Sequence, residues 1–225
     1  MPEKHLVVVG IPALNEEKTI AKVVLRTAGH ADRVVVVDDG SVDDTGLIAE
    51  RLGALVVRHE RNMGKGEALR SIFRVARDLE ADILVTLDGD GQHDPREIPA
   101  LIEPITRGEA DVAIGSRYLG KKPSAKGMPR YRKIGLEAVD DFVRRLGGLS
   151  IKDTQSGFRA YSRKAIQSLM PVERNIAVDS ELLLRAKEKG LNLAEVSVTV
   201  SYEYPKTSKH NPIYHALQVA SGVMK

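Results

Sequence analysis

The stretch Ile83-Leu-Val-Thr-Leu-Asp-Gly-Asp-Gly-Gln92 joins a short, almost wholly apolar run to a pair of aspartates. Such a run is typical of a strand that is buried on both faces of a sheet. Asp88 and Asp90 follow the run directly, with Gly89 between them. In parallel sheets, ligands bind beyond the carboxyl ends of the strands. The stretch therefore predicts a parallel sheet with two carboxylates at its ligand-binding edge.

The same alternation extends on both sides of this stretch. Further strand-like runs occupy residues 6–11, 34–37, 55–57 and 111–115, and amphipathic helical patterns lie between them. This order predicts an α/β fold with a mostly parallel central sheet and helices on both faces. Asn15 is expected to cap the first helix. Residues 196–202 alternate between apolar and polar, which predicts a half-exposed strand near the sheet edge.

Composition limits the classes of protein and partner. The chain has 225 residues, a length that fits one large domain or two small ones. Hydrophobic residues make up 42% and charged residues 29%, which is ordinary for a soluble globular protein. It has no cysteine, so disulfides, cysteine-bound metals and thiol nucleophiles are excluded. Its net charge of +3 and aromatic content of 4% are too low to indicate a nucleic-acid partner. No signal-peptide pattern or long apolar run occurs, which predicts a cytoplasmic location.

The aspartate pair has the chemistry of a metal site. Magnesium in proteins commonly takes one or two carboxylates together with substrate phosphates. Gly89 allows the chain to turn so that both carboxylates face one ion, and Gln92 can add a carbonyl oxygen. A solvated turn would use the same residue types. An aspartyl-phosphate phosphatase, with Asp88 as its nucleophile, is an alternative interpretation.

Two more polar clusters follow predicted strands. Pro12 ends the first strand, and Glu16 can accept a hydrogen bond from the edge of a planar base. Asp39, after the second strand, can bind a base or ribose, or can simply form a turn. The stretch Asn62-Met-Gly-Lys-Gly-Glu67 lacks the spacing of a phosphate-binding loop, so its glycines are expected to bring a helix start close to the site.

The second half of the chain is locally basic. Residues 118–136 contain six lysines and arginines and no acid, and 118–133 are predicted to form a mobile loop. Such a segment is either a solvated charged loop or a binding surface for a doubly anionic ligand or an anionic membrane. Arg117, Arg130 and Arg132 are candidate phosphate ligands, and Lys209 is a further candidate.

Six motifs together resemble the family 2 glycosyltransferases, and most closely the dolichyl-phosphate mannose or glucose synthases. In order they are Pro12-Ala-Leu-Asn-Glu-Glu, Val37-Asp-Asp-Gly-Ser, Asn62-x-Gly-Lys-Gly, Leu87-Asp-Gly-Asp-Gly-Gln, Gly115-Ser-Arg-Tyr and Gln155-Ser-Gly-Phe-Arg. The resemblance implies a single GT-A domain over 1–225. Residues 1–117 would form its nucleotide-sugar-binding half, and 118–225 its acceptor-binding half. It also implies inverting transfer from a nucleoside-diphosphate sugar with Mg²⁺ or Mn²⁺.

The resemblance assigns expected roles to individual residues. The nucleotide sugar would be bound by Pro12, Leu14, Glu16, Val37, Asp39, Asp88, Gly89, Asp90 and Lys209. The metal would be held by Asp88, Asp90 and Gln92. The acceptor phosphate would contact Arg117, Arg130 and Arg132, and the catalytic set would be Asp90, Arg117 and Arg132.

Donor and acceptor remain open at this point. The family often has an arginine shortly before the lysine matched by Lys209, and Tyr202-Glu-Tyr-Pro-Lys-Thr has none, so GDP-mannose and UDP-sugars both stay as donors. A polyprenyl phosphate is already an anion and needs positioning but no general base. A soluble hydroxyl acceptor would need a carboxylate base, for which Asp153 and Asp179 are candidates. A sugar-nucleotide-binding module is the non-enzymatic alternative. A lipid acceptor implies peripheral contact with the cytoplasmic face of a membrane, through the basic loop or residues 213–224.

Overall fold

The computed structural model describes residues 5–120 and 130–201, with the backbone alone for 130–133. The strands are β1 (Val7–Ala13), β2 (Arg33–Asp38), β3 (Leu55–Arg58), β4 (Ile83–Thr86), β5 (Val112–Ser116), β6 (Arg159–Ser162) and β7 (Leu193–Ser197). The helices are α1 (Ile20–Ala28), α2 (Thr45–Arg51), α3 (Lys65–Asp78), the short 3-10 helix η1 (Pro95–Glu97), α4 (Ile98–Thr106), α5 (Arg130–Gly147), α6 (Arg163–Ser168) and α7 (Val178–Glu188).

These strands form one sheet in the order β3-β2-β1-β4-β6-β5-β7. β6 runs antiparallel to both of its neighbours, and every other pairing is parallel. The expected mostly parallel sheet is therefore confirmed. β6 comes from the second half of the chain and lies between two strands of the first half, so the two predicted halves share one sheet. Parallel strands β1, β2 and β4 end at the same edge, as the three polar clusters require.

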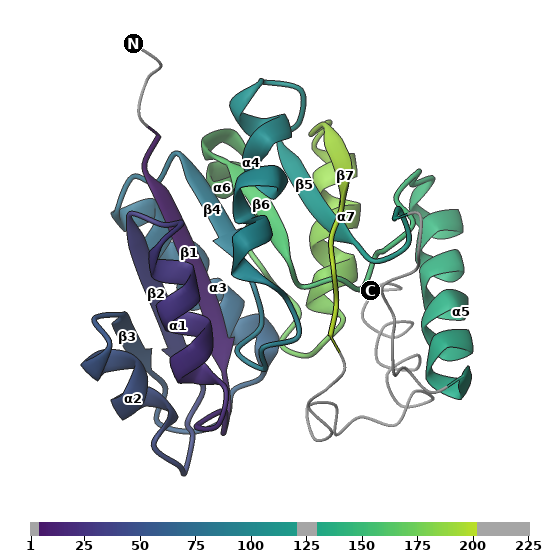
Figure 1. Cartoon of the computed structure of the whole chain (residues 1–225). Helices are drawn as coiled ribbons and strands as arrows, with labels where there is room; N and C mark the ends of the chain where they lie inside the picture. Colours follow the sequence, from purple (N-terminus) through teal and green to yellow (C-terminus); the bar gives the residue numbers. More distant parts are fainter. Residues whose placement is uncertain (1–4, 121–129, 202–225) are drawn as a thin grey trace.

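Helices cover both faces of the sheet (Figure 1). α1, α2 and α4 pack on one face, where Ile20 and Leu101 are fully buried. α3, α5, α6 and α7 contribute to the core on the other face, where the ring centroid of Phe73 lies 5.0 Å from that of Tyr161. Burying each such side chain contributes about 1.5–3 kcal/mol to the stability of the fold. The apolar layers on both faces therefore stabilise the sheet. In Figure 1, α5 stands at the end of the sheet away from β3.

Three local expectations are wrong. The loop expected at 118–133 does not extend over 130–133, because these residues form the first turn of α5. Asn15 does not cap α1, because its backbone is left-handed, with a φ of 56°, and the helix begins only at Ile20. Instead its amide donates to Ser41 Oγ at 2.9 Å, and its side-chain oxygen accepts from the Val42 amide at 2.9 Å. The strand expected at 196–202 lies at Leu193–Ser197, parallel to β5 at the sheet edge. The alternating pattern alone placed this strand too far along the sequence, because pairing with β5 decides where the strand begins.

Helix length and composition also bear on membranes. Among the helices that the structure describes, none combines the length and the apolar character that crossing a bilayer requires.

Candidate active site

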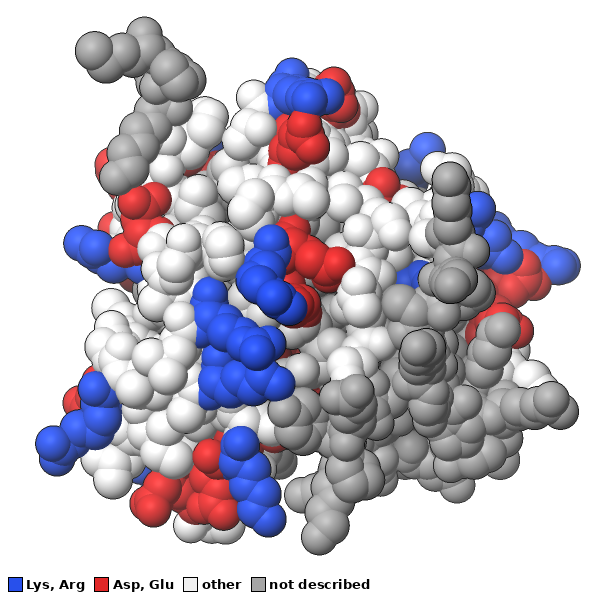
Figure 2. All heavy atoms as spheres, viewed as in Figure 1, with Lys and Arg blue, Asp and Glu red and all other residues white. Residues whose placement is uncertain are grey.

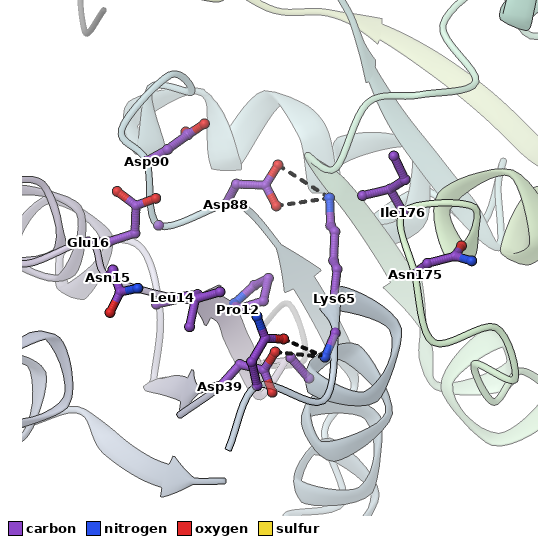
Figure 3. Close-up of a pocket in the computed structure, with 15 residues that line it drawn as sticks. Pro12, Leu14, Asn15, Glu16, Asp39, Lys65, Asp88, Asp90, Asn175 and Ile176 are labelled. Carbon is purple, nitrogen blue, oxygen red and sulfur yellow. Dashed lines mark hydrogen bonds and ion pairs between the residues drawn. The ribbon is translucent and has the colours of Figure 1, made fainter. Parts of the chain in front are cut away.

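A pocket of about 600 Å³ lies at the carboxyl edge of the sheet, beyond β1, β2 and β4 (Figure 3). Its lining includes most of the predicted donor-binding set and several residues that were not predicted. The lining residues are Pro12, Ala13, Leu14, Asn15, Glu16, Asp39, Asn62, Gly64, Lys65, Ala68, Asp88, Gly89, Asp90, Asn175 and Ile176. Polar clusters that are far apart in the sequence thus meet around one hollow.

The aspartate turn is bonded to the loop that follows β1. Gly89 donates its amide to the Pro12 carbonyl at 3.3 Å. Its own carbonyl accepts from Thr19 Oγ1 at 2.8 Å, and this hydroxyl lies 3.0 Å from Glu16 Oε2. A Cβ at Gly89 would lie 3.2 Å from Ala13 Cβ, so glycine permits the close approach. The two loops therefore form one wall of the pocket.

Asp39 anchors the segment that precedes α3. Its carboxylate accepts from the amides of Met63 and Gly64, each at 2.9 Å. His59 Nδ1 lies 2.7 Å from the same carboxylate, and His59 Nε2 lies 2.9 Å from Ser71 Oγ. The histidine had no expected role, since nothing in its local sequence marks it. Asp39 therefore shapes the pocket itself, while its binding of a base or ribose stays a prediction.

Lys65, at the start of α3, is the principal residue that the sequence analysis missed. Its ammonium lies 3.0 Å from Asp88 Oδ1 and 2.9 Å from Asp179 Oδ2 (Figure 3 shows the contact with Asp88). Desolvation opposes its charge, but the two carboxylates, led by Asp179, outweigh it and raise the pKa of Lys65. Desolvation likewise opposes ionisation of Asp88, but the neighbouring positive groups, led by Lys65, together outweigh it and lower the pKa of Asp88. In the local sequence, the only feature that marked Lys65 was its position between two glycines.

The surroundings of Asp90 favour its protonated form, whereas those of Asp88 favour its charged form. Desolvation, and next the negative charge of Asp88, raise the pKa of Asp90 to about 7. Its Oδ1 accepts from the Gln92 amide at 3.0 Å. A divalent cation between the two carboxylates would relieve their repulsion, and Asp88 already attracts the ammonium of Lys65. The donor set thus fits Mg²⁺ or Mn²⁺.

Protein ligands alone do not complete such a site. Within 5–120 and 134–201, no three histidine, aspartate or glutamate side chains gather closely enough to hold a metal ion. Two carboxylates completed by the phosphates of a substrate are the usual arrangement for magnesium. The geometry therefore fits a cation that binds together with a phosphorylated ligand.

Glycines of two predicted motifs allow close contacts at the far wall of the pocket. A Cβ at Gly64 would lie 2.3 Å from the Arg174 carbonyl oxygen, and one at Gly66 would overlap Glu173. The segment carrying Asn175 and Ile176 is thereby held against the start of α3. A Cβ at Gly157 would lie 2.7 Å from Asp88 Oδ2 and 2.9 Å from Lys65 Nζ. These glycines leave room for the ion pair and its surroundings.

Other predicted residues lie outside this pocket. Val37 is fully buried in the core beneath α3. Successive side chains of a strand point to opposite faces of the sheet, and that of Val37 points into the core and not into the pocket. Gln92 is not among the lining residues either. Arg117 donates through Nε to Asp153 Oδ2 at 2.6 Å, and this aspartate is fully buried.

The remaining predicted site residues fall on parts of the chain that are not described. Lys209, most of the predicted basic loop, and the segment 213–224 lie outside the described residues, as do the side chains of Arg130 and Arg132. Their predicted roles stay predictions.

Comparison with known proteins bears on what this pocket is for. The family model described as "Glycosyl transferase family 2" matches residues 8–170. A UDP-N-acetylglucosamine–dolichyl-phosphate N-acetylglucosaminyltransferase of Methanococcus voltae is 36% identical over 212 residues, covering 85% of this chain and 84% of that protein. A polyprenol monophosphomannose synthase of Mycolicibacterium smegmatis is 31% identical over 200 residues, covering 84% of this chain and 75% of that one.

A solved structure shares the architecture. Glucosyl-3-phosphoglycerate synthase from Mycobacterium tuberculosis, crystallised with Mn²⁺, UDP and glucosyl-3-phosphoglycerate, superimposes with a TM-score of 0.72 at 27% sequence identity. The match covers 98% of this chain and 79% of that one. The observed sheet and the neighbour agree with the expected fold.

Proposed function

The chain belongs to glycosyl transferase family 2, has the GT-A fold and is a glycosyltransferase, and we propose that it transfers a hexose from a nucleoside-diphosphate sugar to a polyprenyl phosphate with inversion. The observation that carries this proposal is that Pro12, Glu16 and Asp39 line the same pocket as Asp88 and Asp90. Such a pocket offers one wall to a nucleoside and another to a cation with a diphosphate.

Roles follow from this arrangement. Pro12, Leu14, Glu16 and Asp39 bind the nucleoside, and the aspartate turn from Asp88 to Asp90 holds the cation and the donor diphosphate. When bound, Mg²⁺ or Mn²⁺ supplies charge neutralisation for the diphosphate leaving group. Relatives named for UDP-N-acetylglucosamine and for mannose support a nucleotide sugar without selecting the sugar.

The state of two aspartates favours a phosphate acceptor over a hydroxyl acceptor. Asp153 is buried against Arg117, and Asp179 is paired with Lys65. Neither lines the pocket as a base ready to deprotonate a hydroxyl group. A polyprenyl phosphate brings its own nucleophilic anion and needs only alignment with the anomeric carbon. Arg117, Arg130 and Arg132 are proposed to offset the repulsion between the two phosphorylated substrates.

Domain use and location complete the proposal. Residues 1–117 serve the donor and 118–225 serve the acceptor within one GT-A domain. Because the acceptor is a lipid, the enzyme works peripherally at the cytoplasmic face of a membrane. The relatives named for dolichyl and polyprenol substrates support this placement.

A two-step assay tests the proposal. UDP- and GDP-sugars are first screened with Mn²⁺ or Mg²⁺ for an increase in melting temperature, since a ligand that binds only the native state stabilises it. The donor found is then incubated with a short-chain polyprenyl phosphate, and glycosyl lipid phosphate is detected by mass spectrometry. We expect transfer by the wild type and by Asp44→Asn, whose exposed side chain makes no capping bond, and none by Asp90→Asn.

Each alternative has its own result. Transfer to a soluble sugar and none to lipid phosphate would show that the acceptor is a sugar hydroxyl group. Donor binding without any turnover would indicate a binding module. Metal-dependent phosphate release with phosphorylation of Asp88 would indicate a phosphatase.

A further inference from the structure

Lys65 reaches from the start of α3 to the aspartate turn. Its ammonium lies 3.0 Å from Asp88 Oδ1, 3.4 Å from Asp88 Oδ2 and 2.9 Å from Asp179 Oδ2. Figure 3 shows the Asp88 side chain directed towards this ammonium and away from Asp90. A carboxylate that is proposed to bind a metal ion is therefore already neutralised by a cation of the protein itself.

This ion pair differs from those at the protein surface. Figure 2 shows lysine and arginine side chains beside aspartates and glutamates on the outside of the molecule. Lys164, for example, pairs with Asp111 at 3.1 Å, and the lysine side chain is 62% exposed. Exposed pairs of this kind are screened by water and contribute little. The side chains of Lys65 and Asp179 are only 20% and 8% exposed, so their attraction is screened less.

The backbone on either side of this contact is fixed. The Gly66 amide donates to the Arg174 carbonyl oxygen at 2.9 Å, which holds the start of α3. Arg159 Nη1 donates to the backbone carbonyl of Asp179 at 2.6 Å, which holds the first turn of α7. These bonds keep Lys65 and Asp179 together, so the pair can persist when the aspartate turn binds another cation.

A divalent cation at the aspartate turn has to compete with Lys65. Both cations bind carboxylate oxygens of Asp88, and two positive charges repel each other at such short range. An ammonium has three N–H groups, so a metal ion that takes Asp88 releases N–H groups of Lys65 while Asp179 keeps its own. Lys65 lines the pocket, where the oxygens of a bound diphosphate can accept from the released N–H groups.

We propose that Lys65 is the internal counter-ion of Asp88 and exchanges this carboxylate for the diphosphate of the nucleotide sugar when a divalent cation binds Asp88. The metal ion alone then binds weakly, because it must displace the ammonium without compensation. The metal ion and the nucleotide bind tightly together, because the diphosphate restores the contact that Lys65 loses. The inference rests on the proposed function for the identity of the phosphorylated ligand.

Two titrations of Lys65→Met test the exchange. Mn²⁺ is first titrated alone, with the electron paramagnetic resonance signal of free Mn²⁺ as the measure. UDP, and GDP in parallel, are then titrated by calorimetry at saturating Mn²⁺. We expect Lys65→Met to bind Mn²⁺ alone at least fivefold more tightly than the wild type, and to bind the nucleoside diphosphate at least tenfold more weakly. Lys164→Met, which removes an equal charge from an exposed pair, should leave both affinities within twofold.

A second comparison separates the exchange from stability. Lys65→Met leaves Asp179 without its cation, which destabilises the fold. Asp179→Asn removes that carboxylate, so Lys65→Met/Asp179→Asn is compared with Asp179→Asn alone. The same opposite shifts are expected, towards tighter binding of Mn²⁺ alone and weaker binding of the nucleoside diphosphate. Circular dichroism checks that all variants are folded.

A lysine with only a structural role would give a different result. Mn²⁺ alone and the nucleoside diphosphate would both bind Lys65→Met more weakly, and the double variant would bind the nucleoside diphosphate as Asp179→Asn does. Either result, or a wild type that binds neither UDP nor GDP with Mn²⁺, would overturn the proposal. Transfer to polyprenyl phosphate is a separate measurement. Its absence in the wild type, with both opposite shifts present, would reject the proposed acceptor and support the exchange.

Discussion

Replacing Gly157 with alanine should disable the proposed cation site without unfolding the protein. The backbone at Gly157 does not have positive φ, so its conformation is one that alanine can adopt. The new methyl group would lie 2.7 Å from Asp88 Oδ2, which is about 0.7 Å closer than the 3.4 Å at which ordinary contact begins. The atoms that must yield are the mobile ends of Asp88 and Lys65, so the ion pair shifts while the sheet does not.

The expected effect follows from the size of that shift. A displacement approaching 1 Å at a reacting centre can reduce activity by about 10²-fold, which corresponds to about 2.7 kcal/mol in the activation barrier. Stability should change by no more than about 1 kcal/mol, since alanine lowers the entropy of the unfolded chain and so offsets part of the strain.

The loss of cation binding is measured directly by titrating the protein with Mn²⁺ and monitoring electron paramagnetic resonance. The titration contains the nucleoside diphosphate that the wild type binds. Gly29→Ala is the matched control, because its nearest neighbour would be the Arg26 carbonyl oxygen at 4.0 Å. Urea unfolding of both variants separates stability from binding. A Gly157→Ala protein that binds Mn²⁺ within threefold of the wild type and keeps its turnover would refute the reasoning.

Three further results are expected. Asp90→Asn should raise the Mn²⁺ concentration needed for half-saturation at least tenfold, and an unchanged midpoint would remove Asp90 from the proposed site. Lys65→Met should lower the free energy of unfolding in urea by about 2–3 kcal/mol, since it leaves the largely buried Asp179 unpaired, and adding Asp179→Asn should restore part of it. Burial, and next the charge of Asp153, raise the pKa of Asp140 to about 6, so the native state binds this proton more tightly than the unfolded state. The wild type should therefore lose up to about 3 kcal/mol relative to Asp140→Asn between pH 4 and 6, and parallel pH profiles of unfolding would contradict this.

Much of the fold could be predicted because its signals are local. A strand buried on both faces appears as an apolar run, and a polar cluster after it appears at the ligand-binding edge of a parallel sheet. That reasoning, applied to residues 6–11, 34–37 and 83–87, predicted that Pro12, Asp39 and Asp88 would lie together, and all three line the pocket. The order of six motifs then indicated the family.

Ion pairs between distant segments depend on how the elements pack, and the local sequence does not indicate them. Lys65, Asp88 and Asp179 come from the start of α3, the turn after β4, and α7, and no periodicity within any one of these segments indicates that they meet. The antiparallel insertion of β6 is likewise a choice of partner strands, which an isolated apolar run does not encode. Local sequence determines the shape of each element and the chemistry at its ends, whereas contacts between elements depend on how their packed faces fit together.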